Sequence, residues 1–190
     1  MSLKKELLYP SNILSLSRIV FLPVLFLLLF LRWDIALAVT YAIIGSTDYW
    51  DGKLARRRNE ITELGKKLDS VADVLLYLST VYFFVVLFPQ YLEPNYLLLY
   101  IFFGIFGLSF VVSLIRTKKI VLMHTSLLRL AAVGVYSAFI FSFFFDTTYY
   151  ITVIAVLYIF GFIEEILIFL FYGEVDPDVR YIWLLMKNRE

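Results

Sequence analysis

Six long apolar segments, separated by short polar stretches, account for most of this 190-residue chain. They cover residues 13–31 (interrupted by Arg18), 35–47, 74–88, 96–115, 130–145 and 149–171. A helix needs about 20 residues to cross a membrane, and in lipid only helices and closed barrels satisfy their own backbone hydrogen bonds. The pattern predicts an all-α integral membrane protein with six transmembrane helices, folded as a single domain over residues 1–190.

Positive charge is distributed unevenly between the connections. Lysine and arginine gather before or at the start of the first segment, between the second and third, between the fourth and fifth, and after the sixth, whereas the opposite connections hold only Arg32. The positive-inside rule then places both termini on the cytosolic side of the cytoplasmic (inner) membrane. Residues 2–8 are expected to form a short amphipathic surface helix, with Lys4 and Lys5 toward the headgroups. The net charge of +1 gives no indication of a nucleic-acid partner.

The second and third apolar segments are too short to cross a membrane on their apolar residues alone. The second reaches the necessary length only by including Asp48 and Asp51, and the third only by starting near Asp69. Residues three or four apart share a helix face, so Asp48 pairs with Asp51 and Asp69 pairs with Asp73. Ionisable residues at this depth are costly and by default indicate a functional cavity. The four carboxylates are therefore expected at the cytosolic ends of helices two and three.

Four clustered carboxylates repel one another unless a cation lies among them. Oxygen ligands suit a hard cation such as Mg²⁺ or Mn²⁺, and the absence of cysteine excludes zinc–thiolate sites and thiol nucleophiles. Two metal ions held by shared carboxylates can grip a pyrophosphate and stabilise the attacking and leaving oxygens together. The sequence therefore predicts a site for two Mg²⁺ or Mn²⁺ ions.

The residues between the carboxylates suit a phosphate-containing ligand. Arg56 lies one turn beyond Gly52 on the carboxylate face, where its forked donors reach a phosphate oxygen. Gly52, Ala55 and Gly65 have small or no side chains, which lets a ring or sugar approach the backbone. A carboxylate left free of metal can act as general base toward an incoming hydroxyl, and Asp73, the deepest of the four, is the natural candidate.

The motif has a close parallel in a known family. Asp-x-x-Asp-Gly-x-x-Ala-Arg, followed after eight residues by Gly-x-x-x-Asp-x-x-x-Asp, resembles the signature of the CDP-alcohol phosphotransferases. All eight fixed positions are met, by Asp48, Asp51, Gly52, Ala55, Arg56, Gly65, Asp69 and Asp73. Residues 10–18 are also similar to the segment that opens the first helix in small prokaryotic phospholipid synthases of this family.

The resemblance implies a reaction and a set of roles. A small alcohol attacks a CDP-linked lipid such as CDP-diacylglycerol, CMP leaves, and a phospholipid forms. The four aspartates would hold the divalent metals, with Asp73 doubling as the proton acceptor. Contacts to the CDP moiety would come from seven residues: Gly52, Ala55, Arg56, Thr62 and Gly65 in or near the motif, with Asn12 and Ser15 at the entrance.

The acceptor alcohol is left open by the sequence. A phosphorylated acceptor needs cations outside the CDP site, and Arg116, Arg129 and Arg180 are the candidates. Glycerol 3-phosphate is the first choice, with inositol phosphate or another polar alcohol as alternatives. For Arg129, pairing with Glu164 or Glu165 is an equally good interpretation.

Two other functions use the same residues. A divalent-cation transporter could use the acids as a filter, although transporter sites usually lie near the membrane midplane. A hydrolase that accepts water in place of an alcohol would share every catalytic residue.

Small residues on the fourth helix permit close packing, and a homodimer is the expected assembly. The choice between a diacylglycerol and an archaeal ether-lipid donor also stays open.

Overall fold

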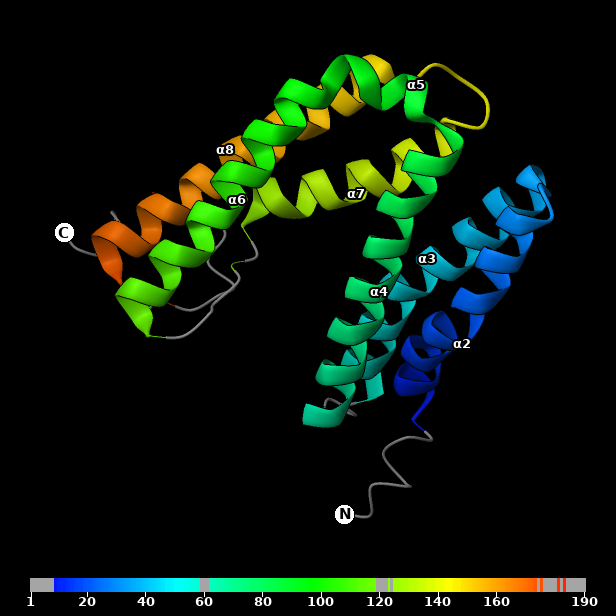
Figure 1. The fold of residues 1–190 in the computed structure, drawn as a ribbon. Helices are drawn as coiled ribbons and strands as arrows, with labels where there is room; N and C mark the ends of the chain where they lie inside the picture. The colour runs from blue at the N-terminus through cyan, green and yellow to red at the C-terminus, as the bar shows by residue number, and fades with distance from the viewer. Residues whose placement is uncertain are drawn as a thin grey trace. The chain divides into compact units, whose positions relative to one another are not determined.

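The computed structural model describes residues 9–58, 62–118, 123, 125–173, 175, 181 and 183, without the side chains of residues 48–58, 63 and 66. Every element in this part of the chain is a helix, as the sequence predicts (Figure 1). The elements are α2 (Pro10–Phe30), α3 (Asp34–Arg58), α4 (Glu63–Leu87), α5 (Pro89–Leu92), the 3₁₀ helix η1 (Glu93–Asn95), α6 (Tyr96–Thr117), α7 (Ser126–Phe141) and α8 (Thr148–Tyr172). The amphipathic helix expected at residues 2–8 lies outside the described residues.

The six long helices correspond to the six apolar segments, but they are not equally suited to crossing a membrane. Four stretches of the described chain are long and apolar enough: Pro10–Phe30, Lys67–Leu87, Pro89–Thr117 and Thr148–Tyr172. The apolar part of α3 (Asp34–Thr47) and α7 (Ser126–Phe141) are shorter. The helix α3 nevertheless continues without a break to Arg58, through Asp48 and Asp51. Length and composition thus support four candidate spans of the six predicted.

Contacts divide the chain into two compact units. The amino-terminal unit comprises residues 1–88 and 139–145, and the carboxyl-terminal unit comprises residues 89–138 and 146–190. The first holds α2, α3 and α4 with the end of α7, and the second holds α5, η1, α6, α8 and the rest of α7. The prediction of one domain stays a prediction, and each unit is described by itself below.

In the amino-terminal unit, α2 packs against both α3 and α4. Aromatic rings pack together at the end of this unit away from Asp69 and Asp73. Phe139 lies edge-on to Tyr41, with ring centroids 4.5 Å apart, and to Phe84, with ring centroids 5.4 Å apart. The Tyr41 hydroxyl also shares a 2.7 Å hydrogen bond with the Thr80 hydroxyl, which links α3 to α4. These contacts hold the three helices together in one packing arrangement. That arrangement also determines which residues of α2 lie beside α4 at the polar ends of the two helices.

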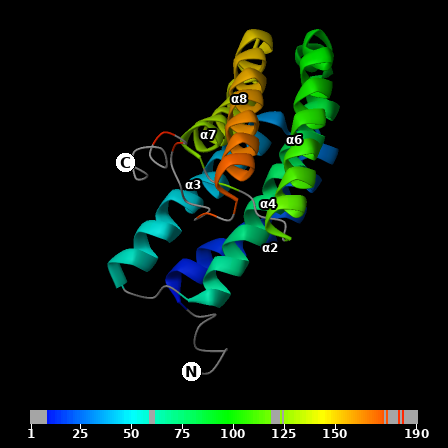
Figure 2. The same ribbon diagram turned by 90° about the vertical axis from the view of Figure 1, so that its left-hand side faces the viewer.

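In the carboxyl-terminal unit, α6 and α8 run side by side (Figure 2). Their interface is aromatic, with Phe102 5.3 Å from Tyr158 and Phe106 4.9 Å from Phe162 between ring centroids. At one end the buried Asn95 amide donates to the Thr148 carbonyl at 3.0 Å and accepts from the Thr152 hydroxyl at 2.6 Å. The polar contacts of Asn95 therefore fix the start of α8 next to η1.

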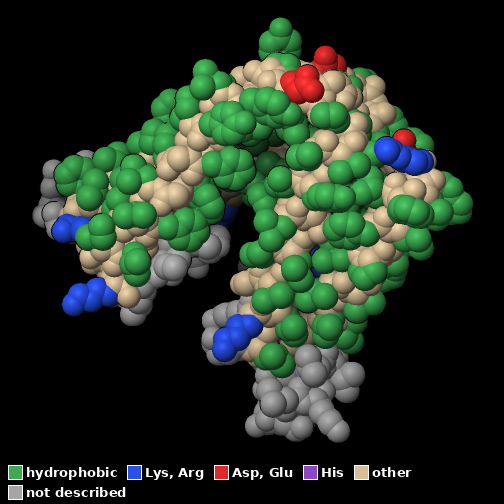
Figure 3. Space-filling view, in the orientation of Figure 1, with side chains coloured by type: hydrophobic (Ala, Val, Ile, Leu, Met, Phe, Trp, Pro, Cys, Tyr) green, Lys and Arg blue, Asp and Glu red, His purple; other side chains and the backbone are tan. Residues whose placement is uncertain are grey.

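Apolar side chains cover the outer surfaces of the helices (Figure 3). Phe30, Leu97 and Tyr149 are each more than 70% exposed, and many other large hydrophobic side chains are at least half exposed. Soluble proteins rarely expose continuous apolar surface of this extent, whereas lipid accepts it without cost. The exterior is that of an integral membrane protein.

Candidate metal and nucleotide site

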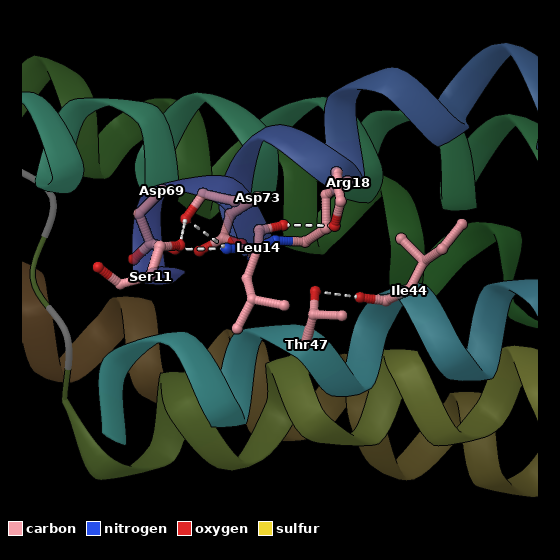
Figure 4. A network of polar contacts seen from close by, with 9 residues as sticks. Ser11, Leu14, Arg18, Ile44, Thr47, Asp69 and Asp73 are labelled. Atoms are coloured by element: carbon pink, nitrogen blue, oxygen red, sulfur yellow. Dashed lines mark hydrogen bonds and ion pairs between the residues drawn. The ribbon is translucent and has the colours of Figure 1, made fainter. Parts of the chain in front are cut away.

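A buried arginine, Arg18, joins Asp69 and Asp73, the last two aspartates of the motif (Figure 4). From α2, Arg18 donates through Nη2 to Asp69 Oδ1 at 2.5 Å and through Nη1 to Asp73 Oδ1, both on α4. The Arg18 side chain is fully buried, whereas the side chains of Asp69 and Asp73 are 41% and 50% exposed. The two carboxylates therefore share one helix face, as their four-residue spacing predicts, and converge on one cationic group.

Arg18 belongs to a polar stripe on an otherwise apolar helix. Ser11, Ser15 and Arg18 recur at the spacing of one α-helical face, and all three are buried. Ser15 Oγ accepts from Arg18 Nη2 at 3.3 Å and donates to the Ser11 carbonyl at 3.3 Å. The sequence alone indicates Arg18 as part of the cytosolic positive charge and as the end of the family-like segment 10–18, and it names no partner for it. Its position inside a membrane-length apolar segment was the signal of a buried partner.

Three of the residues predicted to contact CDP lie together at the start of α4. Thr62 is the N-cap, and its hydroxyl accepts from the Gly65 backbone N–H at 3.0 Å. A Cβ at Gly65 would lie 2.5 Å from Asn12 Oδ1 and 3.2 Å from Thr62 Oγ1. A side chain at position 65 would therefore require Asn12 to move. The structure therefore brings Asn12, Thr62 and Gly65 together, one to two turns from Arg18 along α2.

The first part of the motif, residues 48–56, lies on the carboxyl-terminal part of α3. The backbone of Asp48, Asp51, Gly52, Ala55 and Arg56 is helical, and their side chains lie outside the described part. The three-residue spacing of Asp48 and Asp51 on a continuous helix puts them on one face. The residue before Asp48, Thr47, donates to the Ile44 carbonyl at 2.7 Å and is drawn across from Leu14 of α2 in Figure 4.

The described donor atoms suit a hard divalent cation. Asp69 and Asp73 offer carboxylate oxygens alone, which is the ligand chemistry of Mg²⁺ and Mn²⁺. The Arg18 guanidinium already acts as their counter-cation, because it donates a hydrogen bond to one oxygen of each carboxylate. Among the described side chains no group of three or more potential metal ligands occurs. The side chains of the other two predicted ligands, Asp48 and Asp51, are not among those described.

The three arginines proposed for the acceptor have different surroundings. Arg116, in the last turn of α6, donates through Nε to the Phe169 carbonyl at 3.3 Å and through Nη2 to the Leu170 carbonyl at 2.7 Å. It therefore caps the carboxyl-terminal end of α8. Arg129 is exposed in the first turn of α7, and Arg180 lies outside the described residues. The acceptor roles of all three stay predictions.

One buried acid in the carboxyl-terminal unit has a role that the sequence did not reveal. Glu165 of α8 is fully buried, and its Oε1 accepts from the Met123 backbone N–H at 3.1 Å. The sequence indicates Glu164 or Glu165 as a partner of Arg129, with at least one of the two facing the cavity. The hydrogen bond ties Met123, three residues before α7, to the carboxyl-terminal half of α8. The signal for it in the sequence is a glutamate inside an apolar segment.

A surface hollow in the amino-terminal unit is distinct from the carboxylate site. It has a volume of about 490 Å³ and lies between the far ends of α2 and α4, lined by Phe26, Leu29, Phe30, Arg32, Tyr82 and Val86. Along α2, Phe26 is eight residues from Arg18, or about 12 Å at 1.5 Å per residue. The hollow therefore contributes nothing to the carboxylate site.

Comparison with known proteins places the chain in a family. The family model for CDP-alcohol phosphatidyltransferases matches residues 8–164. A cardiolipin synthase (CMP-forming) of Streptomyces coelicolor is 46% identical over 76 residues, which cover 36% of this chain and 35% of that protein. Two proteins named CDP-diacylglycerol–glycerol-3-phosphate 3-phosphatidyltransferase, from Rickettsia typhi and Escherichia coli, are 37% and 39% identical over 68 residues.

These alignments are partial. Each of the latter two covers 34% of this chain, and 38% and 37% of the respective relative, so the chain matches little more than a third of each relative's length. No solved structure matches the chain significantly. The family model, by contrast, extends from α2 into α8 and includes the whole motif. The chain belongs to the CDP-alcohol phosphatidyltransferase family.

Proposed function

We propose that this protein transfers a phosphatidyl group from CDP-diacylglycerol, or a related CDP-linked lipid, to a small alcohol and releases CMP within a membrane. Family membership supports the reaction class. The observation that carries the proposal is the convergence of Asp69 and Asp73 on one cation at the polar end of α2 and α4. Such a pair is suited to a metal-dependent transfer at phosphorus, where positioning and charge neutralisation supply most of the catalysis.

The proposed roles follow the chemistry of the side chains. Asp48, Asp51, Asp69 and Asp73 would hold two Mg²⁺ or Mn²⁺ ions, which when bound neutralise the pyrophosphate and polarise the bond that breaks. Asn12, Ser15, Thr62 and Gly65 would line the entrance for the CDP moiety, with Gly52, Ala55 and Arg56 on α3. The acceptor oxygen attacks the lipid-side phosphorus, and the bond from that phosphorus to the CMP oxygen breaks. The acceptor proton passes to Asp73, and CMP departs with the bonding electron pair.

The proposed setting is a membrane with the site on its cytosolic side. In this proposal α3 and α7 complete six crossings and both termini are cytosolic, which agrees with the charge asymmetry of the connections. The α3 helix has 25 residues, or about 37 Å, which is long enough to cross when its charged end reaches the headgroups. We also propose a homodimer. In its support, a Cβ at Gly104 or Gly107 of α6 would meet no atom within 4 Å, which leaves open helix surface there.

Glycerol 3-phosphate is the proposed acceptor, because several relatives carry it in their names. Inositol phosphate or another polar alcohol is the alternative. An acceptor phosphate would be bound by Arg129 and Arg180. Arg116 would contribute the guanidinium N–H groups that do not donate to the Phe169 and Leu170 carbonyls of α8.

The test is a CMP-release assay on the purified protein. It is incubated with CDP-diacylglycerol, Mg²⁺ or Mn²⁺, and in turn glycerol 3-phosphate, inositol phosphate, uncharged alcohols or water alone. We expect CMP and a new phospholipid only with metal and alcohol. Asp69→Asn and Asp73→Asn should each reduce turnover by orders of magnitude, because each removes a proposed metal ligand. CMP release with water alone would indicate a hydrolase, and near-normal turnover in both variants would contradict the proposed site.

A further inference from the structure

The guanidinium of Arg18 is a buried positive charge that contacts two acidic side chains. It has no exposed surface, and it lies on a helix of otherwise apolar membrane-span character. A buried charge is tolerated only when its partners are well placed. Its two nearest partners, Asp69 and Asp73, are 51 and 55 residues away in sequence. Arg18 is not one of the eight fixed positions of the motif, although it ends the segment 10–18 that resembles the start of the family's first helix.

Two carboxylates share the guanidinium of Arg18. Asp69 and Asp73 bring two negative charges to one guanidinium, which offers a single positive charge. Each carboxylate turns Oδ1 toward Arg18, and its side chain stays 41% or 50% exposed. The pair is therefore accessible to a second cation from the exposed side, while Arg18 holds it from the buried side.

We propose that Arg18 is the resident counter-cation of the Asp69–Asp73 pair and binds it in competition with the divalent metal. This inference rests on the proposed metal site. In the metal-free protein Arg18 relieves the repulsion between the two carboxylates and pins α2 to α4. A divalent ion at the same carboxylates meets the positive charge of Arg18, so Arg18 weakens metal binding. Arg18 is a positioning residue and not a catalytic one.

The size of the effect follows from the charges. A divalent ion bound by these carboxylates would be repelled by the guanidinium, and a repulsion of about 1.4 kcal/mol, which two such charges several ångströms apart reach even at the dielectric constant of water, corresponds to a factor of ten in affinity. Because Arg18 is buried, the screening is weaker and the factor is larger. Removal of the charge should therefore tighten metal binding by at least about tenfold.

The experiment compares five forms of the protein in detergent. Arg18→Gln removes the charge but keeps hydrogen-bond donors, and Arg18→Lys keeps the charge but replaces the fork with a single ammonium. Arg32→Gln is the matched control, because Arg32 is an exposed arginine just beyond the opposite end of α2. Mn²⁺ affinity is measured by electron paramagnetic resonance of the free ion, and the melting temperature is measured with and without Mn²⁺. Asp69→Asn/Asp73→Asn identifies the Mn²⁺ ions that belong to this site.

We expect Arg18→Gln to lower the metal-free melting temperature, to bind Mn²⁺ at least about tenfold more tightly, and to gain more stability from Mn²⁺ than the wild type does, by linkage. Arg18→Lys should bind Mn²⁺ with nearly wild-type affinity, and Arg32→Gln should match the wild type in every measurement. A variant that folds only when Mn²⁺ is present also supports the proposal.

Equal or weaker Mn²⁺ binding by Arg18→Gln would overturn the proposal, because Arg18 would then support the metal or merely join the helices. Should Arg18→Gln fail to fold even with Mn²⁺, Arg18→Lys decides: a loss of metal affinity there overturns the competition. CMP release by the wild type is assayed separately. Tighter Mn²⁺ binding without CMP formation would leave this inference standing and remove the proposed function.

Discussion

The side-chain amide of Asn12 occupies the space where a side chain on Gly65 would begin, since a Cβ there would lie 2.5 Å from Asn12 Oδ1. Asn12 is buried near the start of α2, and Gly65 lies in the first turn of α4. The Asn12 side chain of α2 therefore lies directly against the backbone of α4 at Gly65. The motif glycine leaves room for Asn12 here, apart from any part it has in binding a nucleotide.

Gly65→Ala should destabilise the protein by about 1–3 kcal/mol, the usual cost of overpacking. Adding Asn12→Ala should recover much of this loss, because it removes the atom that the new methyl meets. Thermal unfolding in detergent, followed by tryptophan fluorescence, measures both. Asn12→Ala alone is the control, because it measures what the loss of the Asn12 amide costs when Gly65 is kept. Equal losses for Gly65→Ala with and without Asn12 would contradict the close approach.

Glu165 should be needed for stability through the hydrogen bond that its Oε1 accepts from the Met123 N–H. Glu165→Ala leaves that N–H without its acceptor, which costs about 1–3 kcal/mol for a buried group. Glu165→Gln retains a carbonyl oxygen and should unfold close to the wild-type temperature. If the two variants are equally destabilised, the negative charge of Glu165 matters and not its bond to Met123.

Arg116 should contribute to stability by capping α8. Arg116→Ala removes the donors to the Phe169 and Leu170 carbonyls, and we expect a loss of about 0.5–1 kcal/mol because the side chain is exposed. Lys118→Gln removes a neighbouring exposed charge without touching α8 and should leave stability unchanged. Both variants are compared by thermal unfolding and by acceptor KM. A higher acceptor KM for Arg116→Ala with unchanged stability would contradict the capping role.

The proposed topology predicts which side of the membrane each end of α4 faces. The helix has 25 residues, or about 37 Å, more than the roughly 30 Å of the hydrocarbon core. The chain has no cysteine, so single cysteines can be introduced at Glu63, before the apolar part of α4, and at Glu93, beyond it. A membrane-impermeant thiol reagent should label Glu63→Cys only from the cytosolic side and Glu93→Cys only from the opposite side. Labelling of both from one side would show that α4 does not cross.

The sequence was sufficient for the helices and for the candidate ligands. Apolar segments of membrane length predict helices because lipid leaves the backbone no other way to satisfy its hydrogen bonds. The spacing of Asp69 and Asp73 places both on one face, since this is a local property of any α-helix. The family follows from the eight motif positions, and the family model matches residues 8–164.

Only the tertiary structure decided which faces meet. Helical periodicity shows that Ser11, Ser15 and Arg18 share a face, but it does not say that this face packs on α4. The contacts of Arg18 with Asp69 and Asp73 and of Glu165 with Met123 join residues more than 40 positions apart. Hydrogen bonds and ion pairs act over about 3 Å, so such partners emerge only when the packing of all the helices is known. The local sequence determined that Asp69 and Asp73 share one face of α4, and helix packing placed the Arg18 guanidinium of α2 against them.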